Sequence, residues 1–212
     1  MLRTRVKICG ITRPEDGRCA VDNGADAIGL VFFPESPRHI SADRAIEITS
    51  ALDPFVTVVG LFVNASQASI EQVLGQVPLD LLQFHGQERN EDCNGYGLPF
   101  IKSIAMQPGV DLPETMAAYP DARGFLLDTW QPKTHGGGGE MFDWQQIPPE
   151  LQSPFILAGG LTPENVGAAI RRARPYAVDV SSGVESAPGI KSAVKITAFM
   201  NGVINSGTEP SN

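Results

Sequence analysis

The chain has 212 residues, of which 42% are hydrophobic, and its formal net charge is -8 at pH 7. This length suits one domain, and the apolar share is enough for a sizeable core, so we expect no help from metals or disulfides. The acidic balance, without clusters of Lys and Arg, excludes general binding to nucleic acids or anionic membranes.

The three cysteines, Cys9, Cys19 and Cys93, are widely separated and form no C-x-x-C pair. This spacing is typical of reduced thiols in a cytoplasmic protein. The amino terminus lacks the apolar core of a signal peptide, and no apolar run approaches the ~20 residues of a membrane span. We therefore predict a cytoplasmic protein without a membrane anchor.

Short apolar runs alternate with helix-type segments along the chain. Thr12 is a reasonable N-cap for the first helix, and Ser41 caps the second. The sequence predicts strands at residues 5–9, 27–32, 56–63, 79–84, 100–105, 124–127, 155–158 and 177–180. It predicts helices at residues 14–23, 41–52, 66–74, 88–94, 113–118, from 142, 163–172 and 189–201.

Eight strands, each followed by a helix-like segment, predict an α/β fold with one closed parallel (β/α)8 TIM barrel. Residues 1–204 would form the barrel domain, and residues 205–212 a polar, disordered tail. The strands are continuous apolar runs, as expected for strands buried on both faces. An open doubly wound sheet is the alternative. Against it, Cys-Gly-Ile-Thr follows the first strand where a Gly-rich dinucleotide fingerprint would stand.

Two successive strand ends carry small residues that expose the backbone. The run 155–158 leads to Gly159 and Gly160, with a helix expected to open at residues 162–164, and the run 177–180 leads to Ser181, Ser182 and Gly183. Glycines let N–H groups approach an anion closely, and a helix N-terminus adds a favourable dipole. The last two loops of such a barrel often bind phosphate, so this pair predicts a phosphate site.

Active sites in this architecture lie at the carboxyl ends of the strands, where Cys9 and Asp128 are found. Cys9 is either a small core residue or a thiolate base whose pKa is lowered by nearby cations, with Lys7 and Arg38 as candidates. Asp128 either caps a turn or, partly buried in a cleft, serves as a proton donor.

Three more polar residues stand near strand ends. Arg38 is either a solvated loop residue or a carboxylate-binding group in a loop that Pro34 and Pro37 stiffen. His85, before a glycine, is more often a turn histidine than a catalyst. Asp179 either hydrogen-bonds a sugar hydroxyl or is a structural acceptor.

The histidines, at positions 39, 85 and 135, do not show the spacing of metal ligands, so no metal is expected. Four consecutive glycines at residues 136–139 form no nucleotide loop, because no Lys-Ser or Lys-Thr follows them. This segment is either a flexible lid over the site or a slack surface loop.

Several segments together resemble the phosphoribosylanthranilate isomerase family in the family's order, over residues 6–196 or so. They are residues 7–12 (KICGIT), 29–34 (GLVFFP), 36–38 (SPR), 59–64 (VGLFVN), 83–86 (QFHG), 126–128 (LLD), 142–144 (FDW), 157–165 and 179–185. The chain departs from the family's pattern in three places: glycines at 137–139 where a Thr is usual, Ser192 where Asp is common after Lys191, and Phe84 in place of Leu.

The resemblance implies a cofactor-free Amadori rearrangement of N-(5-phosphoribosyl)anthranilate in tryptophan biosynthesis, by an isomerase of the aldose–ketose type. It implies that Asp128 is the general acid, Cys9 the general base, and Arg38 the group near the anthranilate carboxylate. It places His85 at the substrate and Asp179 near the ribose hydroxyls. The phosphate would be held by Gly159, Gly160, Ser181, Ser182 and Gly183. The expected partner is a small phosphorylated substrate, and the chain is expected to be a monomer or a homodimer.

Two other functions remain open from the sequence. One is a neighbouring barrel enzyme, such as the histidine-pathway isomerase with two carboxylates or indoleglycerol-phosphate synthase with Lys and Glu, and Cys9 with Asp128 argues against both. The other is a barrel that binds a phosphorylated ligand without catalysis. Intact Cys9, Asp128 and Arg38 argue against that.

Overall fold

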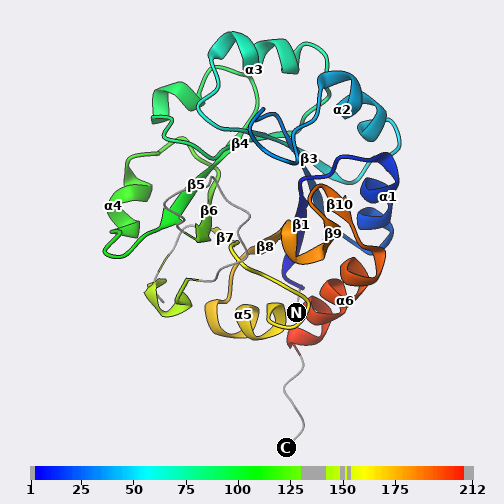
Figure 1. The fold of residues 1–212 in the computed structure, drawn as a ribbon. Coiled ribbons are helices and arrows are strands. Elements are labelled where there is room, and N and C mark those ends of the chain that lie inside the picture. The colour runs from blue at the N-terminus through cyan, green and yellow to red at the C-terminus, as the bar shows by residue number, and fades with distance from the viewer. Residues whose placement is uncertain (1–2, 130–141, 149–150, 152–153, 208–212) are drawn as a thin grey trace, which may run out of the picture.

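The computed structural model describes residues 3–129, 142–148, 151 and 154–207. Eight parallel strands, paired in chain order, close into a barrel with helices around its outside (Figure 1). The predicted (β/α)8 barrel is thus confirmed. The strands are β1 (Arg5–Cys9), β2 (Ala27–Val31), β3 (Thr57–Phe62), β4 (Leu81–Phe84), β5 (Phe100–Met106), β6 (Gly124–Thr129), β7 (Phe155–Leu157) and β8 (Ala177–Val180).

Six α-helices and four short 3-10 helices lie in the described part of the chain. Ser41 and Ser66 cap the second and third α-helices by accepting bonds from the N–H groups of Arg44 and Ser69. The helices are α1 (Pro14–Asp22), α2 (Ala42–Thr49), α3 (Gln67–Leu74), α4 (Leu112–Ala117), α5 (Val166–Ala173) and α6 (Ala193–Ile204), with η1 (Asn90–Cys93), η2 (Trp144–Gln146), η3 (Ser182–Val184) and η4 (Asn205–Gly207).

Some predicted helix starts are wrong. Thr12 is not the cap of α1, because Arg13 takes that position and the Thr12 hydroxyl bonds the carbonyl of Gly189 instead. Helix α5 begins at Val166, since the expected first turn is an irregular turn in which the Asn165 side chain accepts from the Thr162 N–H. The weak helices expected near residues 88 and 142 are the 3-10 turns η1 and η2.

The largest difference lies before the last helix. Ile190 and Lys191, expected in the first turn of that helix, form the strand β10 (Ile190–Lys191) of an antiparallel hairpin with β9 (Glu185–Ala187). Helix α6 begins at Ala193, and Ser192 caps it by accepting from the N–H of Lys195. The departure at Ser192 therefore leaves the helix cap in place. Of the expected tail, residues 205–207 form η4, and residues 208–212 lie outside the described part.

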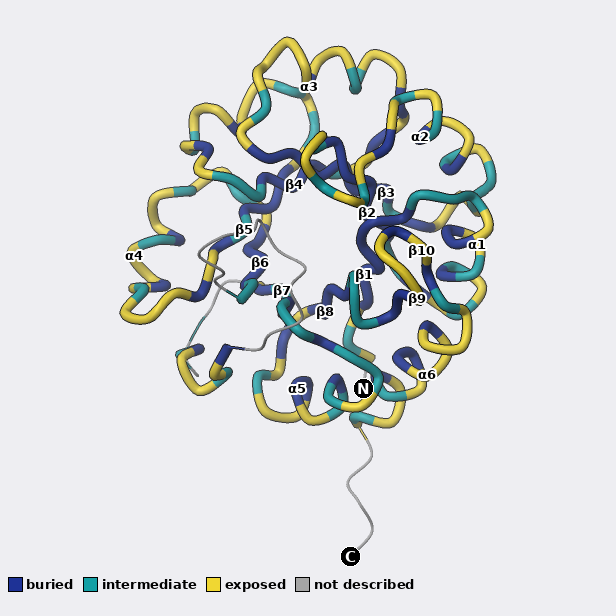
Figure 2. The backbone as a smooth tube through the Cα atoms, in the orientation of Figure 1, coloured by how far each residue is buried: buried dark blue, intermediate teal, exposed yellow. Residues whose placement is uncertain are grey.

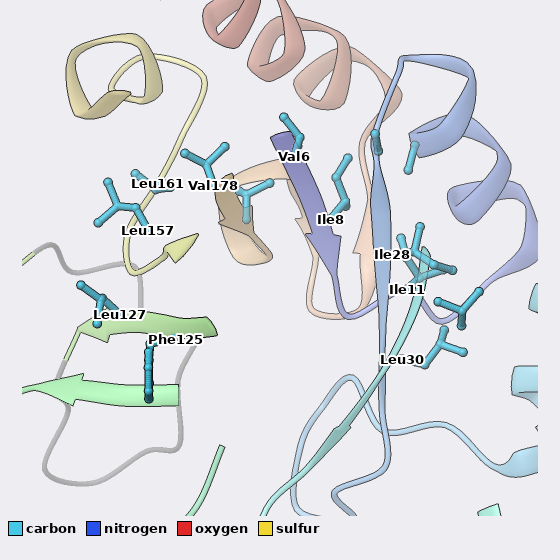
Figure 3. Packing of buried hydrophobic residues seen from close by; sticks show 14 of the residues in the cluster. Val6, Ile8, Ile11, Ile28, Leu30, Phe125, Leu127, Leu157, Leu161 and Val178 are labelled. Atoms are coloured by element: carbon cyan, nitrogen blue, oxygen red, sulfur yellow. The ribbon is translucent and has the colours of Figure 1, made fainter. Parts of the chain in front are cut away.

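Alternation along each strand divides its side chains between the helix-facing layer and the barrel interior. On β1, Val6 and Ile8 belong to the main core between strands and helices (Figure 3). Cys9 belongs to a separate small cluster, made of Cys9, Val31, Leu61 and Val63 with Phe33 against it. The barrel strands are almost wholly buried, whereas the outer faces of the helices are exposed (Figure 2).

Phe84, which replaces the leucine usual at its position, is fully buried. Its ring lies 5.7 Å edge-on from that of Phe100 and 6.4 Å from that of Phe62, so the larger side chain fills an aromatic cluster behind β4. None of the helices among the described residues is long and apolar enough to cross a bilayer.

Candidate active site

A cavity at the carboxyl ends of the strands gathers most of the predicted polar side chains. The sequence singled out half of its lining: Cys9, Arg38, His85, Asp128, Asp179 and Ser181. The other lining residues are Val31, Phe33, Ser36, Leu61, Val63 and Gln83. Residues from β1, β4, β6 and β8 and from the loop after β2 thus converge, because parallel strands end on one face of the barrel.

Cys9 ends β1 and is buried, with 5% of its surface exposed. Burial raises the pKa of its thiol, and the attraction of the nearby Lys7 ammonium offsets only part of that rise. The sequence analysis expected nearby cations to lower this pKa. Lys7 does lower it, but the effect of burial is larger, so the pKa is raised. Lys191 also lowers it, and Arg38, the other predicted cation, interacts electrostatically with the Cys9 thiolate as well.

Lys7 lies two residues before Cys9, on the same inner face of β1, and its ammonium donates to Oδ1 of Asp179 at 2.9 Å. The two residues are register partners on neighbouring strands, and both side chains are almost fully buried. The ion pair outweighs burial and raises the pKa of Lys7, which stays charged beside the thiol. Asp179 therefore has a structural partner as well as a position in the cavity.

Asp128 lies near the end of β6, and its carboxylate is oriented from two sides. Its Oδ1 accepts the N–H of Thr129 at 2.8 Å, and its Oδ2 lies 3.3 Å from Nε2 of His85. His85 follows β4, two strands away around the barrel. His85 also lines the cavity, so its predicted place at the substrate stays a prediction beside this contact with the candidate acid.

Gln83 and Ser103 contact His85, and the sequence analysis assigned neither of them a role. The Ser103 hydroxyl lies 2.8 Å from Nδ1 of His85, and the Gln83 amide nitrogen lies 3.0 Å from the same atom. When both groups donate to Nδ1, the ring proton is on Nε2 and points to Asp128. Gln83 lies two residues before His85, and residues two apart in an extended strand point to the same face. This alternation could have predicted that Gln83 faces the site.

The two loops predicted to bind phosphate do come together. A Cβ atom added to Gly183 would lie 1.9 Å from the carbonyl oxygen of Leu161, so the loop after β8 touches the loop after β7. A Cβ on Gly159 would lie 2.6 Å from the backbone nitrogen of Thr129, at the end of β6. Of the five predicted phosphate residues, Ser181 lines the cavity, Ser182 and Gly183 follow it in η3, and Gly159, which precedes Gly160, packs against Asp128 of the lining.

Arg38 is held by a partner that the sequence analysis did not assign. Its Nε and Nη2 donate to the two carboxylate oxygens of Glu185, both at 2.8 Å. The Lys191 ammonium donates to Oε1 of the same carboxylate at 2.8 Å and to the carbonyl of Ser181 at 3.2 Å. The hairpin β9–β10 thereby brings two charged residues to the cavity's edge.

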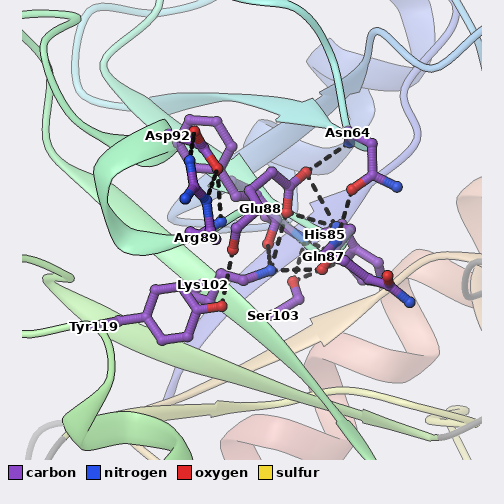
Figure 4. Close-up of polar contacts among 12 residues, drawn as sticks. Asn64, His85, Gln87, Glu88, Arg89, Asp92, Lys102, Ser103 and Tyr119 are labelled. Atoms are coloured by element: carbon purple, nitrogen blue, oxygen red, sulfur yellow. Dashed lines mark hydrogen bonds and ion pairs between the residues drawn. The ribbon is translucent and has the colours of Figure 1, made fainter.

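A further buried ion pair, between Lys102 and Glu88, holds the turn that follows His85 (Figure 4). Lys102 donates to Oε2 of Glu88 at 3.0 Å and to the carbonyl of Gly86 at 2.7 Å. Glu88 in turn accepts the N–H groups of Gly86, at 2.9 Å, and of Asn64, at 2.7 Å. This network fixes the loops after β3 and β4 to β5.

Among the described residues, no group of three or more His, Cys, Asp or Glu side chains is arranged to hold a metal ion. The glycine segment at 136–139, with His135, lies outside the described residues, so the lid stays a prediction from the sequence.

Known proteins match this chain over nearly its whole length. The family model described as N-(5'phosphoribosyl)anthranilate (PRA) isomerase matches residues 6–202. An N-(5'-phosphoribosyl)anthranilate isomerase of Nitrosococcus oceani is 56% identical over 95% of this chain and 98% of its own length. The crystal structure of phosphoribosyl anthranilate isomerase from Thermotoga maritima matches with a TM-score of 0.88 and 42% identity, over 95% and 99% of the two chains. A structure of this enzyme in complex with reduced 1-(o-carboxyphenylamino)-1-deoxyribulose 5-phosphate has a TM-score of 0.84 and 40% identity, over the same shares.

Proposed function

The chain belongs to the N-(5'-phosphoribosyl)anthranilate isomerase family, and we propose that Cys9 and Asp128 carry out the proton transfers of that family's reaction. The resemblance expected from the sequence is thus confirmed. The enzyme is an isomerase of tryptophan biosynthesis that converts N-(5-phosphoribosyl)anthranilate to 1-(2-carboxyphenylamino)-1-deoxyribulose 5-phosphate.

Asp128 acts as the general acid in this proposal. It protonates the furanose ring oxygen, the bond from that oxygen to C1 breaks, and a Schiff base forms between C1 and the anthranilate nitrogen. The contact of Oδ2 with Nε2 of His85 and that of Oδ1 with the Thr129 N–H fix the carboxyl group in one orientation. A fixed donor of this kind contributes about 10²–10⁴-fold to the rate.

Cys9 acts as the general base. Its thiolate removes the proton from C2, which gives an enolamine, and the enolamine becomes the ketone as C1 gains a proton and the C2 hydroxyl loses one. Substrate and product are isomers, so the transfers balance without an external oxidant or reductant. The buried Lys7 ammonium supports the thiolate electrostatically, which is the observation that favours a base at this position.

The remaining site residues bind and orient the substrate. Gly159, Gly160, Ser181, Ser182 and Gly183 bind the phosphate, which the convergence of the two loops at Gly183 and Leu161 supports. Arg38 binds the anthranilate carboxylate, and Asp179 lies near the ribose hydroxyls. His85 keeps Asp128 in position.

One experiment tests the assigned activity directly. Purified protein with a chelator present is mixed with N-(5-phosphoribosyl)anthranilate, and consumption of the substrate is followed by its fluorescence. We expect multiple turnovers without added metal or cofactor. If the substrate binds but is not consumed, the chain is a binding module rather than an enzyme.

We also propose a cellular location and an oligomeric state for the enzyme. A cytoplasmic location is supported by three free cysteines in the described residues and by the biosynthetic reaction. One matched structure is of monomers generated from a dimeric enzyme of Thermotoga maritima. We propose a monomer or a homodimer for this chain, to be distinguished by sedimentation equilibrium.

A further inference from the structure

Within the described residues, the β9–β10 hairpin reaches the edge of the cavity, and the proposed proton transfers give it no role. It is fastened to its surroundings on several sides. The Lys191 N–H donates to the carboxylate of Asp16 in α1 at 3.1 Å, and the Thr12 hydroxyl bonds the carbonyl of Gly189 at the hairpin's tip. In addition, Lys195 of α6 donates to the carbonyl of Glu185 at 2.7 Å. A hairpin held this firmly can position a side chain with little loss of conformational entropy.

Glu185 is the side chain that the hairpin positions. Its side chain is 5% exposed and receives hydrogen bonds from two cations, Arg38 and Lys191, whose side chains are 13% and 0% exposed. An unpaired carboxylate at this depth would be strongly unfavourable, so the pairing itself keeps the charge in place. The contact joins residues 147 positions apart in the chain and is bidentate on the Arg38 side.

The bidentate contact determines which part of Arg38 is left for a ligand. A guanidinium carries five N–H groups, and Glu185 takes the one on Nε and one on Nη2. The two on Nη1 and the second on Nη2 are not engaged by Glu185. The edge formed by Nη1 and Nη2 is itself a two-pronged donor that matches a second carboxylate.

We propose that Glu185 is a positioning residue that turns the Nη1–Nη2 edge of Arg38 toward the substrate, and thereby makes the enzyme specific for an aryl amine that bears a carboxylate. This inference rests on the proposed contact between Arg38 and the anthranilate carboxylate. Glu185 itself does not touch the substrate.

The charges of Arg38, Lys191 and Glu185 agree with this role. Burial opposes ionisation of Glu185, but the hydrogen bonds from Arg38 and the charge of Lys191 outweigh it and lower the pKa of this carboxyl. Glu185 is therefore ionised at neutral pH. Burial lowers the pKa of Lys191 in spite of the ion pair. While Lys191 stays protonated, two cations and one anion leave one positive charge, which matches the single charge of an aryl carboxylate.

The test compares two ligands that differ only in the carboxylate. One is reduced 1-(o-carboxyphenylamino)-1-deoxyribulose 5-phosphate, and the other is the phenylamino compound without the carboxyl group. Inhibition constants are measured for the wild type and for Glu185→Gln, which keeps the shape and removes the charge. We expect Glu185→Gln to raise the inhibition constant of the carboxylated ligand about tenfold and that of the other ligand less than twofold.

Two further variants guard against a folding defect. Glu185→Asp keeps the charge but withdraws it by one methylene, and we expect a smaller loss that is again confined to the carboxylated ligand. Glu47→Gln removes the carboxylate of an exposed ion pair with Arg44 and should leave both constants unchanged. Equal weakening of both ligands in Glu185→Gln and Glu185→Asp would mean a merely structural role and would overturn the proposal.

The Arg38 assignment is tested separately. Arg38→Met should lose the preference for the carboxylated ligand, and Glu185→Gln added to Arg38→Met should change that preference no further. If Arg38→Met keeps the preference, the proposed function of Arg38 is wrong. If Arg38→Met loses it but Glu185→Gln lowers it equally in both backgrounds, then Glu185 does not act through Arg38 and the inference fails on its own.

Discussion

The ammonium of Lys102 lies 3.0 Å from a carboxylate oxygen of Glu88, and both side chains are less than 5% exposed. The pair bridges β5 and the loop after β4, directly behind the turn that begins at His85 (Figure 4). Because Glu88 also accepts the Gly86 and Asn64 N–H groups, its carboxylate satisfies backbone donors that would otherwise be buried without partners.

Removing one partner of this pair should destabilise the fold strongly. Lys102→Met leaves the Glu88 charge buried, and we expect it to lower the free energy of unfolding by about 3–5 kcal/mol. The double variant with Glu88→Gln should recover part of the loss, since no buried charge remains and Gln still accepts hydrogen bonds. Urea unfolding at neutral pH measures both. A loss below about 1 kcal/mol in Lys102→Met, as for an exposed pair, would contradict the assigned role.

Replacing the candidate acid should affect the chemical step rather than binding. For Asp128→Asn we expect kcat to fall about 10²–10⁴-fold, with KM nearly unchanged, because the amide occupies the same space but does not protonate the ring oxygen. Steady-state kinetics on N-(5-phosphoribosyl)anthranilate measure this. Asp53→Asn, in the exposed loop before β3, is the matched control and should behave as the wild type. Activity near the wild-type level in Asp128→Asn would end its assignment as the acid.

The candidate base can be compared with a second buried cysteine. Cys9→Ala should lower kcat by about 10²–10⁴-fold and still bind the reduced product analogue. Cys93 is also buried but lies outside the site, and burial raises the pKa of its thiol to about 12, so it has no thiolate to offer. Cys93→Ala should keep kcat and lose only stability. Equal kcat values for the two variants would remove Cys9 from the mechanism.

The pH dependence of turnover follows from the environment of Cys9. Burial raises the pKa of this thiol above its ordinary value of 9.0, so the base is mostly protonated near neutral pH. If Cys9 acts as a thiolate, kcat/KM should rise with pH by about tenfold per unit where the thiolate is scarce. Lys7→Met removes the cation that lowers this pKa most, so the rise should move to higher pH and activity at pH 7 should fall. A profile identical to the wild type would show that Lys7 does not tune the thiol.

The contact between the two phosphate loops can be tested by adding a single methyl group. Gly183→Ala places a Cβ against the Leu161 carbonyl, so one loop must shift. We expect inorganic phosphate to inhibit about tenfold more weakly, the equivalent of one hydrogen bond to a charged group. Gly207→Ala is the control, because a Cβ there meets no atom within 4 Å. Unchanged inhibition by phosphate in Gly183→Ala would place the anion elsewhere.

Much of the fold and of the site was available from the sequence. The eight apolar runs predicted the strands within a few residues. A strand that is buried on both faces is a continuous apolar run, which can be recognised locally without knowing which strand it pairs with. Cys9, His85, Asp128 and Asp179 were found because the carboxyl end of a barrel strand can be located from the run that precedes it. Gly159 and Gly183 were recognised by residue type, and the tertiary structure adds the contacts that exclude a side chain at each.

Other features depend on closure of the barrel. The sequence shows neither that Glu185 pairs with Arg38 nor that His85 contacts Asp128, because these partners lie on different elements and meet only when the ring of strands is complete. The hairpin was mistaken for a helix start because a two-residue strand has no periodicity to detect. The raised pKa of the Cys9 thiol is also a tertiary property. Lys7 is visible two residues away in the sequence, whereas the desolvation that outweighs its charge comes from the surrounding barrel.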